Sequence, residues 1–365
     1  MRYGTTLGRS VLLTMGLLAA TLAQAEEGRI PIFEPGILPA VSGRYILTRD
    51  VVGTTSASTI QIIGTGVEKM EIDLNGYVLQ ATFGAGGGGD FPVLAAQDLA
   101  ELVVRGGGIV GDSNRSGISC LRCDKVRVED VSVRDVISGI WMTHPGNFEI
   151  RRNVVDNASN YGIRISGDDV SPAPASGTIA DNVIENVDMH GIWVAPTAGL
   201  NGVTLSGNRI RNAGLANGSN KDGIRIESLG PVQVLRNTVT EVRGSGIHAI
   251  VEGGAIEGNI IERADLDGMF VTSSPGTRSS CRIWSNVLLD SGDSGLHLET
   301  DGNQINDNVL NGNTDHGLLF DSTADGNNYQ GNIIVGNGMT CITDNGTGNT
   351  ALAANVLIGS PGGCP

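Results

Sequence analysis

The stretch "KDGIRIES", residues 221–228, decides how this chain folds. Ile224 and Ile226 alternate with Arg225 and Glu227, so the stretch predicts a short β-strand with one buried face and one exposed face. A Lys-Asp-Gly turn precedes the strand, and Asp and Gly are typical of tight turns. A single strand of this kind does not specify a fold, but repeated copies of it would.

The same pattern recurs along the chain. Its copies are "SGIWMT" (138–143), "YGIRIS" (161–166), "HGIWVA" (190–195), "DGIRIE" (222–227), "SGIHAI" (245–250), "DGMFVT" (267–272), "SGLHLE" (294–299) and "HGLLFD" (316–321). Their glycines lie 22 to 32 residues apart, and such a period with short strands and no helical pattern predicts a solenoid. We therefore predict an all-β fold, a single-stranded right-handed parallel β-helix of about ten or eleven coils with three strands per coil.

An asparagine recurs before each new copy. The column contains Asn153, Asn182, Asn208, Asn237, Asn259, Asn286, Asn308 and Asn332, and Asp130 takes this place in "VEDVSV" (128–133). Asparagine tolerates the left-handed conformation of a tight bend, and its amide can hydrogen-bond to the asparagine of the next coil. The column therefore predicts a structural ladder rather than a catalytic set.

The first 25 residues have the features of a cleaved export leader. Arg2 and Arg9 precede an apolar segment, 11–22, and Ala23-Gln24-Ala25 is a small-x-small cleavage site. We predict a secreted or periplasmic protein. No later stretch is apolar enough to span a bilayer, so no membrane insertion is expected. The predicted divisions are a signal peptide (1–25), an N-terminal cap (26–60), the β-helix (61–340) and a C-terminal cap (341–365).

The charge of the chain limits its partners. Loss of the two leader arginines leaves 22 basic and 39 acidic residues, a net charge of −17. Such an acidic surface argues against nucleic acid and anionic membranes as partners. It also requires that any polyanionic sugar meet cations placed locally. The oligomeric state does not follow from these data.

Five cysteines in an oxidising compartment favour structural disulfides. Cys120 and Cys123 are close in sequence, as are Cys341 and Cys364, and Cys281 has no evident partner. Without a thioredoxin-like context, the Cys-x-x-Cys spacing at 120–123 is weak evidence for redox or metal chemistry.

The residue two positions after each repeated glycine is predicted to point outward. These residues, here called the outward column, are Trp141, Arg164, Trp193, Arg225, His248, Phe270, His297 and Leu319. Coils stack about 4.8 Å apart, so eight of them form a strip on the order of 35 Å long. Aromatic rings offer flat faces to sugar rings, and arginine offers a fork to carboxylates. We predict substrate binding by Trp141, Arg164, Trp193, His248 and Phe270; the alternative is a column that only covers the sheet.

Three long loops narrow the site. They are 166–177, 195–202 and 212–222, and all flank the coils that begin at Gly162, Gly191 and Gly223. The polar side chains there give two predicted sets, a catalytic one of Arg225, His190, Lys221 and Tyr161, and a possible Ca²⁺-binding one of Asp168, Asp169, Asp222 and Glu227.

These repeats make the sequence resemble the right-handed parallel β-helix superfamily, over roughly residues 40 to 350. Members include pectate lyases, polygalacturonases, alginate lyases and alginate epimerases. The resemblance implies an acidic, uronate-containing polysaccharide as partner, bound along one strand column. A lyase or C5-epimerase must remove a proton beside a uronate carboxylate, so it needs a cation on that carboxylate and a base near the proton. The Asp-Pro-His signature of alginate epimerases is absent, since His144-Pro145 lacks the preceding aspartate.

Two alternatives stay open. Polygalacturonase-type hydrolases carry Asp-Asp, His-Gly and Arg-Ile-Lys in this order, and here Asp168-Asp169, His190-Gly191 and Arg225-Ile226 follow it. The Asn-Thr-Asp of that family is missing, and Glu227 replaces its lysine. A non-catalytic glycan-binding protein or adhesin is the other alternative, because no complete catalytic motif is present.

Overall fold

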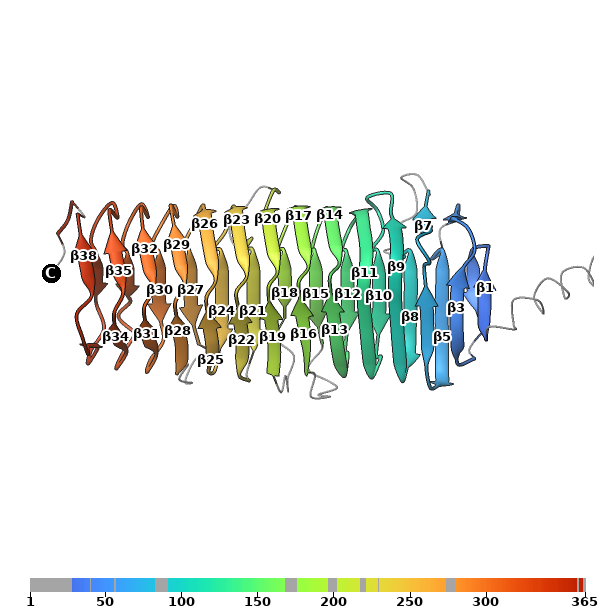
Figure 1. Cartoon of the computed structure of the whole chain (residues 1–365), viewed down its shortest axis with the longest axis horizontal. Helices are drawn as coiled ribbons and strands as arrows, with labels where there is room; N and C mark the ends of the chain where they lie inside the picture. Colours follow the sequence, from blue (N-terminus) through green and yellow to red (C-terminus); the bar gives the residue numbers. More distant parts are fainter. Residues whose placement is uncertain are drawn as a thin grey trace, which may run out of the picture.

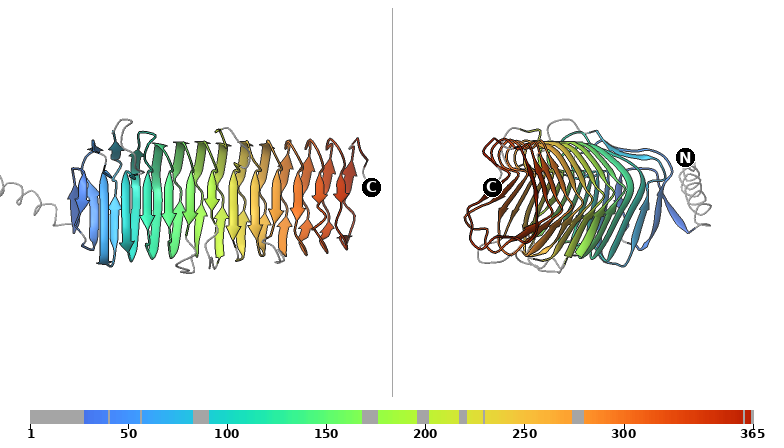
Figure 2. Two further views of the ribbon diagram at one scale, coloured as in Figure 1. Left: turned by 180° about the vertical axis from the view of Figure 1, so that it is seen from behind. Right: turned by 60° about the vertical axis from the view of Figure 1, so that its left-hand side comes forward.

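The computed structural model describes residues 28–39, 41–55, 57–82, 91–167, 176–195, 202–216, 221–228, 230–273, 280–359 and 361–363. Every regular element within these residues is a β-strand. The coils stack along one long axis, from the N-terminal strands to the C-terminal ones (Figure 1). In the right-hand view of Figure 2, which is turned toward this axis, successive coils overlie one another with a similar outline. The predicted parallel β-helix with three strands per coil is confirmed.

The strands form three rows, each strand pairing in parallel with its counterpart in the next coil. Two rows make a 25-stranded sheet, and the third makes a 13-stranded sheet. The first row contains β1 (Arg29–Ile32), β3 (Gly43–Leu47), β6 (Met70–Asp73), β9 (Glu101–Val110), β11 (Lys125–Val136), β13 (Asn147–Arg151), β16 (Ser176–Ala180), β19 (Gly202–Ser206), β22 (Val232–Leu235), β25 (Gly254–Glu257), β28 (Cys281–Trp284), β31 (Gln304–Asn306), β34 (Asn328–Gln330) and β37 (Thr350–Ala351).

The other two rows complete each coil. The second row contains β4 (Val51–Gly53), β7 (Val78–Ala81), β14 (Val154–Ala158), β17 (Val183–Val187), β20 (Arg209–Ala213), β23 (Thr238–Val242), β26 (Ile260–Ala264), β29 (Val287–Leu289), β32 (Val309–Asn311), β35 (Ile333–Val335) and β38 (Val356–Ile358), and β9 and β11 run on into it. The third row contains β2 (Gly36–Leu38), β5 (Ile60–Val67), β8 (Leu94–Leu99), β10 (Ile118–Leu121), β12 (Ile140–Thr143), β15 (Ile163–Ser166), β18 (Ile192–Val194), β21 (Ile224–Ser228), β24 (Ile247–Val251), β27 (Met269–Thr272), β30 (Leu296–Glu299), β33 (Leu318–Phe320) and β36 (Ile342–Asp344).

The solenoid is slightly longer than the ten or eleven predicted coils. Its third row has 13 strands, one per coil. The additional coils begin at the N-terminal end, where β1 already pairs with β3 and β2 with β5. The third-row strands β5 and β8 are not preceded by glycine, and Gly36-Ile37 of β2 is shifted by one residue relative to the motif, so the repeat pattern did not reveal these coils.

The core is a stack of aliphatic side chains. On the third row, Ile140, Ile163, Ile192, Ile224 and Ile247 are in register on neighbouring coils, and all are fully buried. The alternating pattern of "IRI" therefore places its isoleucines inside and its arginine outside, as predicted.

The asparagine column forms the predicted ladder. From Asn153 to Asn332, each side-chain Nδ2 donates to Oδ1 of the asparagine in the next coil, and the ladder continues to Asn355. The same Oδ1 also accepts the backbone N–H of the preceding asparagine in the ladder. The N–H of Asn182, for example, donates to Oδ1 of Asn208, with 3.1 Å between nitrogen and oxygen. All of these asparagines from 153 to 332 are buried.

Two details of the asparagine prediction are wrong. The left-handed residue of the bend is the one before each asparagine, as at Arg152 (φ 53°) and Asp181 (φ 56°). Asp130 is such a residue (φ 57°) and is exposed, so it does not replace an asparagine. The ladder ends instead where the N–H of Val131 donates to Oδ1 of Asn153. The asparagine side chain has to face inward to make its hydrogen bonds, which leaves the strained position to its neighbour.

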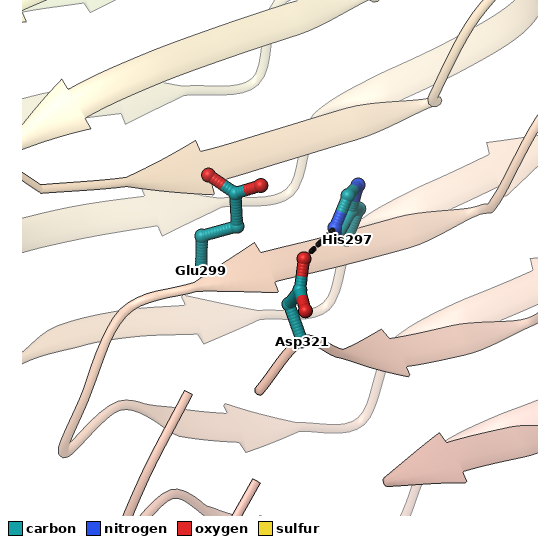
Figure 3. Close-up of side chains that lie close together, drawn as sticks. All are labelled: His297, Glu299 and Asp321. Atoms are coloured by element: carbon teal, nitrogen blue, oxygen red, sulfur yellow. Dashed lines mark ion pairs between the residues drawn. The ribbon is translucent and has the colours of Figure 1, made fainter. Parts of the chain in front are cut away.

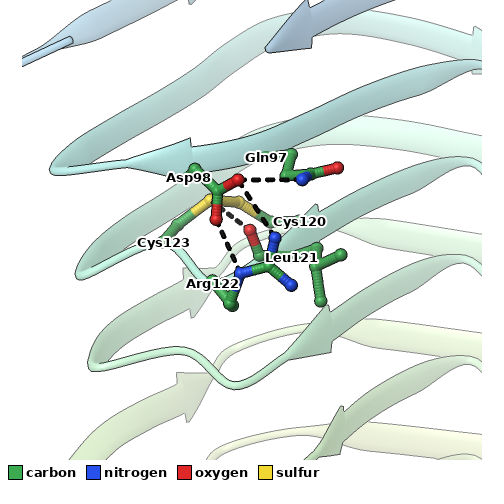
Figure 4. Close-up of a disulfide and its surroundings, with 6 residues drawn as sticks. All are labelled: Gln97, Asp98, Cys120, Leu121, Arg122 and Cys123. Atoms are coloured by element: carbon green, nitrogen blue, oxygen red, sulfur yellow. Dashed lines mark hydrogen bonds and ion pairs between the residues drawn. A yellow bond between two sulfur atoms is a disulfide. The ribbon is translucent and has the colours of Figure 1, made fainter. Parts of the chain in front are cut away.

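Cys120 and Cys123 form a disulfide, which confirms a structural link at this turn. Arg122 lies between them with φ 52° and makes two hydrogen bonds to Asp98 of the preceding coil (Figure 4). Cys341 is buried and disulfide-bonded, Cys364 lies outside the described residues, and Cys281 is buried. In the described part of the chain, no helix is long and apolar enough to cross a membrane. The predicted leader lies outside that part.

Candidate functional site

The outward column lies in one line on the third row. Direct register joins Trp141 to Arg164, Arg164 to Trp193, Trp193 to Arg225 and Arg225 to His248, and continues through Phe270 and His297 to Leu319. Each side chain is half-buried. The prediction that these residues share one face is therefore confirmed, and the strip they form is continuous.

The strip begins beside a cavity that the sequence did not reveal. Toward the N-terminus the same outward positions hold Ala95 and Ser119, which are small, before Trp141. The change in side-chain size leaves a hollow of about 270 Å³, lined by Gln61, Ile63, Ala95, Ser119, Trp141 and others. The N-terminal part of the face is thus hollowed, and Trp141 forms one wall.

Arg164 is surrounded by aromatic rings. Its guanidinium carbon lies 4.8 Å from the ring centroid of Trp141, 5.0 Å from that of Tyr161 and 4.5 Å from that of Trp193. These distances are typical of cation–π contacts. Among the described residues, no carboxylate lies within ion-pair distance of Arg164, and its Nε has no hydrogen-bond partner. Burial lowers the pKa of this guanidinium. Within the described residues, Arg164 is therefore a half-buried cation without a counter-charge.

Tyr161, which contacts Arg164, also packs against His190. Their rings stack with centroids 6.0 Å apart, and both contact Trp193. Nδ1 of His190 accepts the N–H of Asp222, so the ring is neutral and carries its proton on Nε2. Burial lowers the pKa of His190 to about 4 and raises the pKa of Tyr161. Near neutral pH, both side chains are therefore uncharged proton donors.

Arg225 has carboxylate partners, unlike Arg164. Its Nε donates to Oε1 of Glu227 at 2.5 Å and its Nη1 donates to Oδ2 of Asp222 at 3.2 Å. Nη1 is also 3.1 Å from Nδ1 of His248. The Arg-x-Glu of "GIRIE" is therefore an ion pair between two outward residues of one strand. Most of the charge of Arg225 is compensated within the protein.

Asp222 is the buried centre of this network. Its Oδ1 accepts the N–H of Ser245, and its Oδ2 lies 3.4 Å from Nδ1 of His248 and 3.7 Å from Nδ1 of His190. Burial opposes its ionisation, but contacts with His248, His190 and the Ser245 N–H hold its pKa below the ordinary aspartate value. Asp222 thus links two coils and carries a negative charge that needs Arg225.

The structure brings together only part of the predicted catalytic set and of the predicted Ca²⁺-binding set. Lys221 is buried, and its Nζ donates to the carbonyl of Ala216 at 2.7 Å, so it contacts the backbone there. Asp168 and Asp169 lie outside the described residues. Asp222 and Glu227 both contact Arg225, which places a cation where Ca²⁺ was predicted. The roles of these residues stay predictions.

The C-terminal part of the column is a second aromatic stack. Phe270 lies between His248 and His297, with ring centroids 4.7 and 4.8 Å apart. Nε2 of each histidine is shielded and has no hydrogen-bond partner among the described residues. Beside His297 lie Glu299 and Asp321, which the sequence reasoning did not select. The signal was present in "SGLHLE", where a glutamate follows the histidine by two positions on the same face.

Sequence comparison gives the family. A family model described as "Right handed beta helix region" matches residues 103–228, 138–290 and 216–357, which together exceed two thirds of the chain. This chain belongs to the right-handed β-helix family. No curated protein matches the sequence of this β-helix at a significant level.

Two solved structures are similar to this β-helix. One is the catalytic unit of a thermostable α-1,3-glucanase from Streptomyces thermodiastaticus, with a TM-score of 0.58, 13% identity and coverage of 96% of this chain and 66% of that one. The other is a double mutant of the periplasmic alginate epimerase AlgG, with a TM-score of 0.50, 16% identity and coverage of 82% and 67%. The β-helix thus spans about two thirds of each protein's length. At these identities the likeness is one of fold.

Proposed function

We propose that this β-helix binds an acidic, uronate-containing polysaccharide along its outward column. The observation that carries the proposal is Arg164, a cation among the rings of Trp141, Tyr161 and Trp193 with no carboxylate partner among the described residues. On a strongly acidic chain, such a cation favours an anionic ligand. Polysaccharides as the ligand class are supported by the two similar structures, whose names are those of a glucanase and an alginate epimerase.

The geometry suits a sugar chain that lies along the strip. Trp141 and Trp193 flank Arg164 on the coils before and after it, so a ring pressed against either tryptophan lies beside the guanidinium. The outer nitrogens of Arg164 can donate to both oxygens of a carboxylate. The hollow beside Trp141 extends the surface toward the N-terminus.

Affinity electrophoresis tests this function. The purified protein is run through gels containing alginate, pectate, a glycosaminoglycan or α-1,3-glucan, each with Ca²⁺ and with a chelator. We expect retardation by at least one uronate polymer and weaker retardation by the neutral glucan. Equal retardation by neutral and acidic polymers, or no retardation by any polymer, would show that the protein does not bind uronate polymers preferentially through Arg164. The Ca²⁺ arms test the proposed cofactor at the same time.

Proton abstraction of the lyase or C5-epimerase type is the second candidate function. The observation that favours it is the buried carboxylate of Asp222, which contacts both His248 and Arg225. With Nδ1–H of His248 directed at Asp222, Nε2 would have a lone pair for the C5 proton, and substrate binding would have to expose this shielded nitrogen. A lyase then breaks the C4–O bond, and the leaving oxygen takes a proton; an epimerase returns a proton to the opposite face of C5. Tyr161 and His190 are the neutral donors nearby.

Product analysis separates the remaining classes. Unsaturated uronates absorb in the ultraviolet, C5 inversion is visible by NMR, and hydrolysis produces reducing ends without unsaturation. The hydrolase alternative depends on Asp168 and Asp169, outside the described residues. Retardation without any product would support a non-catalytic glycan-binding protein. Export is proposed from the leader sequence, and a mature N-terminus at Glu26 by mass spectrometry would support it.

A further inference from the structure

Three metal-ligating side chains meet at the C-terminal end of the outward column. His297 and Glu299 are two residues apart on β30 and so share its outward face, while Asp321 directly follows β33 on the next coil. One donor atom from each lies within 4.8 Å of the others (Figure 3). No other group of three or more His, Cys, Asp and Glu side chains in the described part of the chain comes together in this way.

His297 is oriented as a metal ligand would be. Nδ1 of His297 lies 3.2 Å from Oδ2 of Asp267, and Oδ1 of Asp267 accepts the N–H of Ser294 at 3.0 Å. Asp267 is therefore fixed by backbone and can accept Nδ1–H, which places the lone pair on Nε2. Histidines that bind metals commonly donate their second nitrogen to a carboxylate in this manner. The shielded Nε2 has no hydrogen-bond partner among the described residues and lies 3.9 Å from Oδ2 of Asp321.

In the part of the chain that the structure describes, the two carboxylates also lack a compensating arginine or lysine. In the described residues, no arginine or lysine is within ion-pair distance of Glu299 or Asp321, and the only ion-pair partner of Asp321 is His297. Elsewhere on the surface, carboxylates pair with arginines of neighbouring coils, as Glu241 does with Arg211 and Arg263. The cluster therefore has uncompensated negative charge next to an available imidazole nitrogen.

The donor set selects the class of ion. Ca²⁺ and Mg²⁺ prefer oxygen ligands alone, whereas imidazole together with carboxylates suits zinc and related transition metals. Zinc binds such atoms at about 2.0–2.2 Å, so small side-chain rotations would bring the three donors to one ion. Three protein ligands leave further coordination positions for water or a ligand.

We propose that His297, Glu299 and Asp321 bind one divalent transition-metal ion of the zinc type, with Asp267 as the positioning residue of His297. This site is distinct from the predicted Ca²⁺ ligands and does not depend on the proposed glycan function.

Isothermal titration with Zn²⁺ tests the proposal, using chelator-treated protein without a polyhistidine tag. We expect one saturable site per chain, weakened at least tenfold in His297→Gln, Glu299→Gln and Asp321→Asn. His316→Gln is the matched control, since this histidine contacts Thr340 and Thr343 instead and should leave zinc affinity unchanged. Asp267→Asn should weaken binding tenfold to a hundredfold by disturbing the orientation of His297. Circular dichroism checks that each variant is folded.

Absorption spectroscopy of the unmodified protein tests the metal site without relying on these variants. Co²⁺ bound to the unmodified protein should give visible absorption bands that Zn²⁺ abolishes and excess Ca²⁺ does not. No saturable binding, binding retained in all three ligand variants, or preference for Ca²⁺ over Zn²⁺ would each overturn the proposal.

Discussion

The outward faces of the two sheets use charge in opposite ways. On the 25-stranded sheet, charged side chains of neighbouring coils pair with each other, as Arg151 does with Glu129 at 2.8 Å and Arg211 with Glu241 at 2.8 Å. On the 13-stranded sheet, Arg164 lies among aromatic rings with no such partner in the described residues. Paired charges of this kind need no ligand. Arg134 and Arg209 on the 25-stranded sheet also lack an ion-pair partner in the described residues, but they are exposed to solvent. Arg164 is half-buried among aromatic rings, and this makes it the cation suited to bind a ligand.

The same contrast exists within the outward column. Arg164 and Arg225 occupy equivalent positions two coils apart, joined in register through Trp193. Arg225 compensates the buried charge of Asp222, whereas Arg164 pairs with none of the carboxylates that the structure describes. Identical positions in a repeat can therefore serve stability in one coil and ligand binding in another. Substitutions at these positions would sharpen or break this distinction.

Arg225→Ala should have the largest effect on stability. It would leave the carboxylate of Asp222 buried without its cation, and breaking a buried pair in this way costs about 3 kcal/mol or more of unfolding free energy. Denaturant unfolding measures this loss. Arg164→Ala should cost clearly less, because it removes ring contacts and leaves no charge unpaired. Adding Asp222→Asn to Arg225→Ala should recover part of the loss; no recovery would mean that Asp222 is not the reason.

The pH dependence of stability should reveal the burial of His190. Its folded pKa is about 4, against an ordinary value of 6.5, so the unfolded chain takes up a proton first as the pH falls. The neutral ring thus contributes stability that is present above pH 6.5 and lost toward pH 4, at most roughly 3 kcal/mol. The titratable groups that face it are Asp222, Arg225, Glu227 and His248.

His190→Gln isolates this contribution. The melting temperature of the unmodified protein should fall between pH 6.5 and 4 more steeply than that of the variant. Parallel curves would show that the ring is solvated, and the stacked arrangement with Tyr161 and Trp193 would then be wrong.

Sequence reasoning predicted the geometry of the face well and its chemistry poorly. Alternation and the repeated glycine were sufficient to place Trp141, Arg164, Trp193 and Arg225 in one outward line, because parallel coils in register stack equivalent residues. The pairing of Arg225 with Glu227 was not predicted, since the sequence analysis assigned Glu227 to a Ca²⁺ site and Arg225 to the catalytic set. The sequence did not reveal that Asp222 is buried, because a residue in a turn before a glycine is ordinarily exposed.

Contacts between coils explain the remaining differences. Arg225 and Arg164 occupy the same position in their strands, and two neighbours distinguish them: Asp222 against Tyr161 before the arginine, and Glu227 against Ser166 after it. Glu299 and Asp321 meet because consecutive coils bring residues 22 positions apart together, a distance set by the length of one coil. Such pairs depend on exact register, which a repeat of varying length does not specify.

Arg164→Ala should weaken binding to a uronate polymer without a matching loss of stability. Removal of a charge-assisted hydrogen bond to a carboxylate costs about 1.5–3 kcal/mol, or roughly tenfold to a hundredfold in affinity. Arg164→Lys should restore only part of it, because lysine lacks the two-pronged donor. Titration with a defined uronate oligosaccharide gives the affinities. Full restoration by lysine would indicate that only the charge matters.

Arg151→Ala should have the smallest effect of these substitutions. Arg151 lies on β13 of the same coil as Arg164 but faces outward from the 25-stranded sheet, where it pairs with Glu129 and Glu149. Exposed pairs of this kind contribute less than about 1 kcal/mol and are screened by salt. Unfolding at low and high salt should therefore show a small loss at Arg151 that high salt removes. Affinity for the uronate oligosaccharide should stay within about twofold of the unmodified protein, since Glu129 and Glu149 already compensate the charge of Arg151. If Arg151→Ala weakened binding as much as Arg164→Ala, the ligand would respond to the overall charge of the coil, and the two faces would not differ in function.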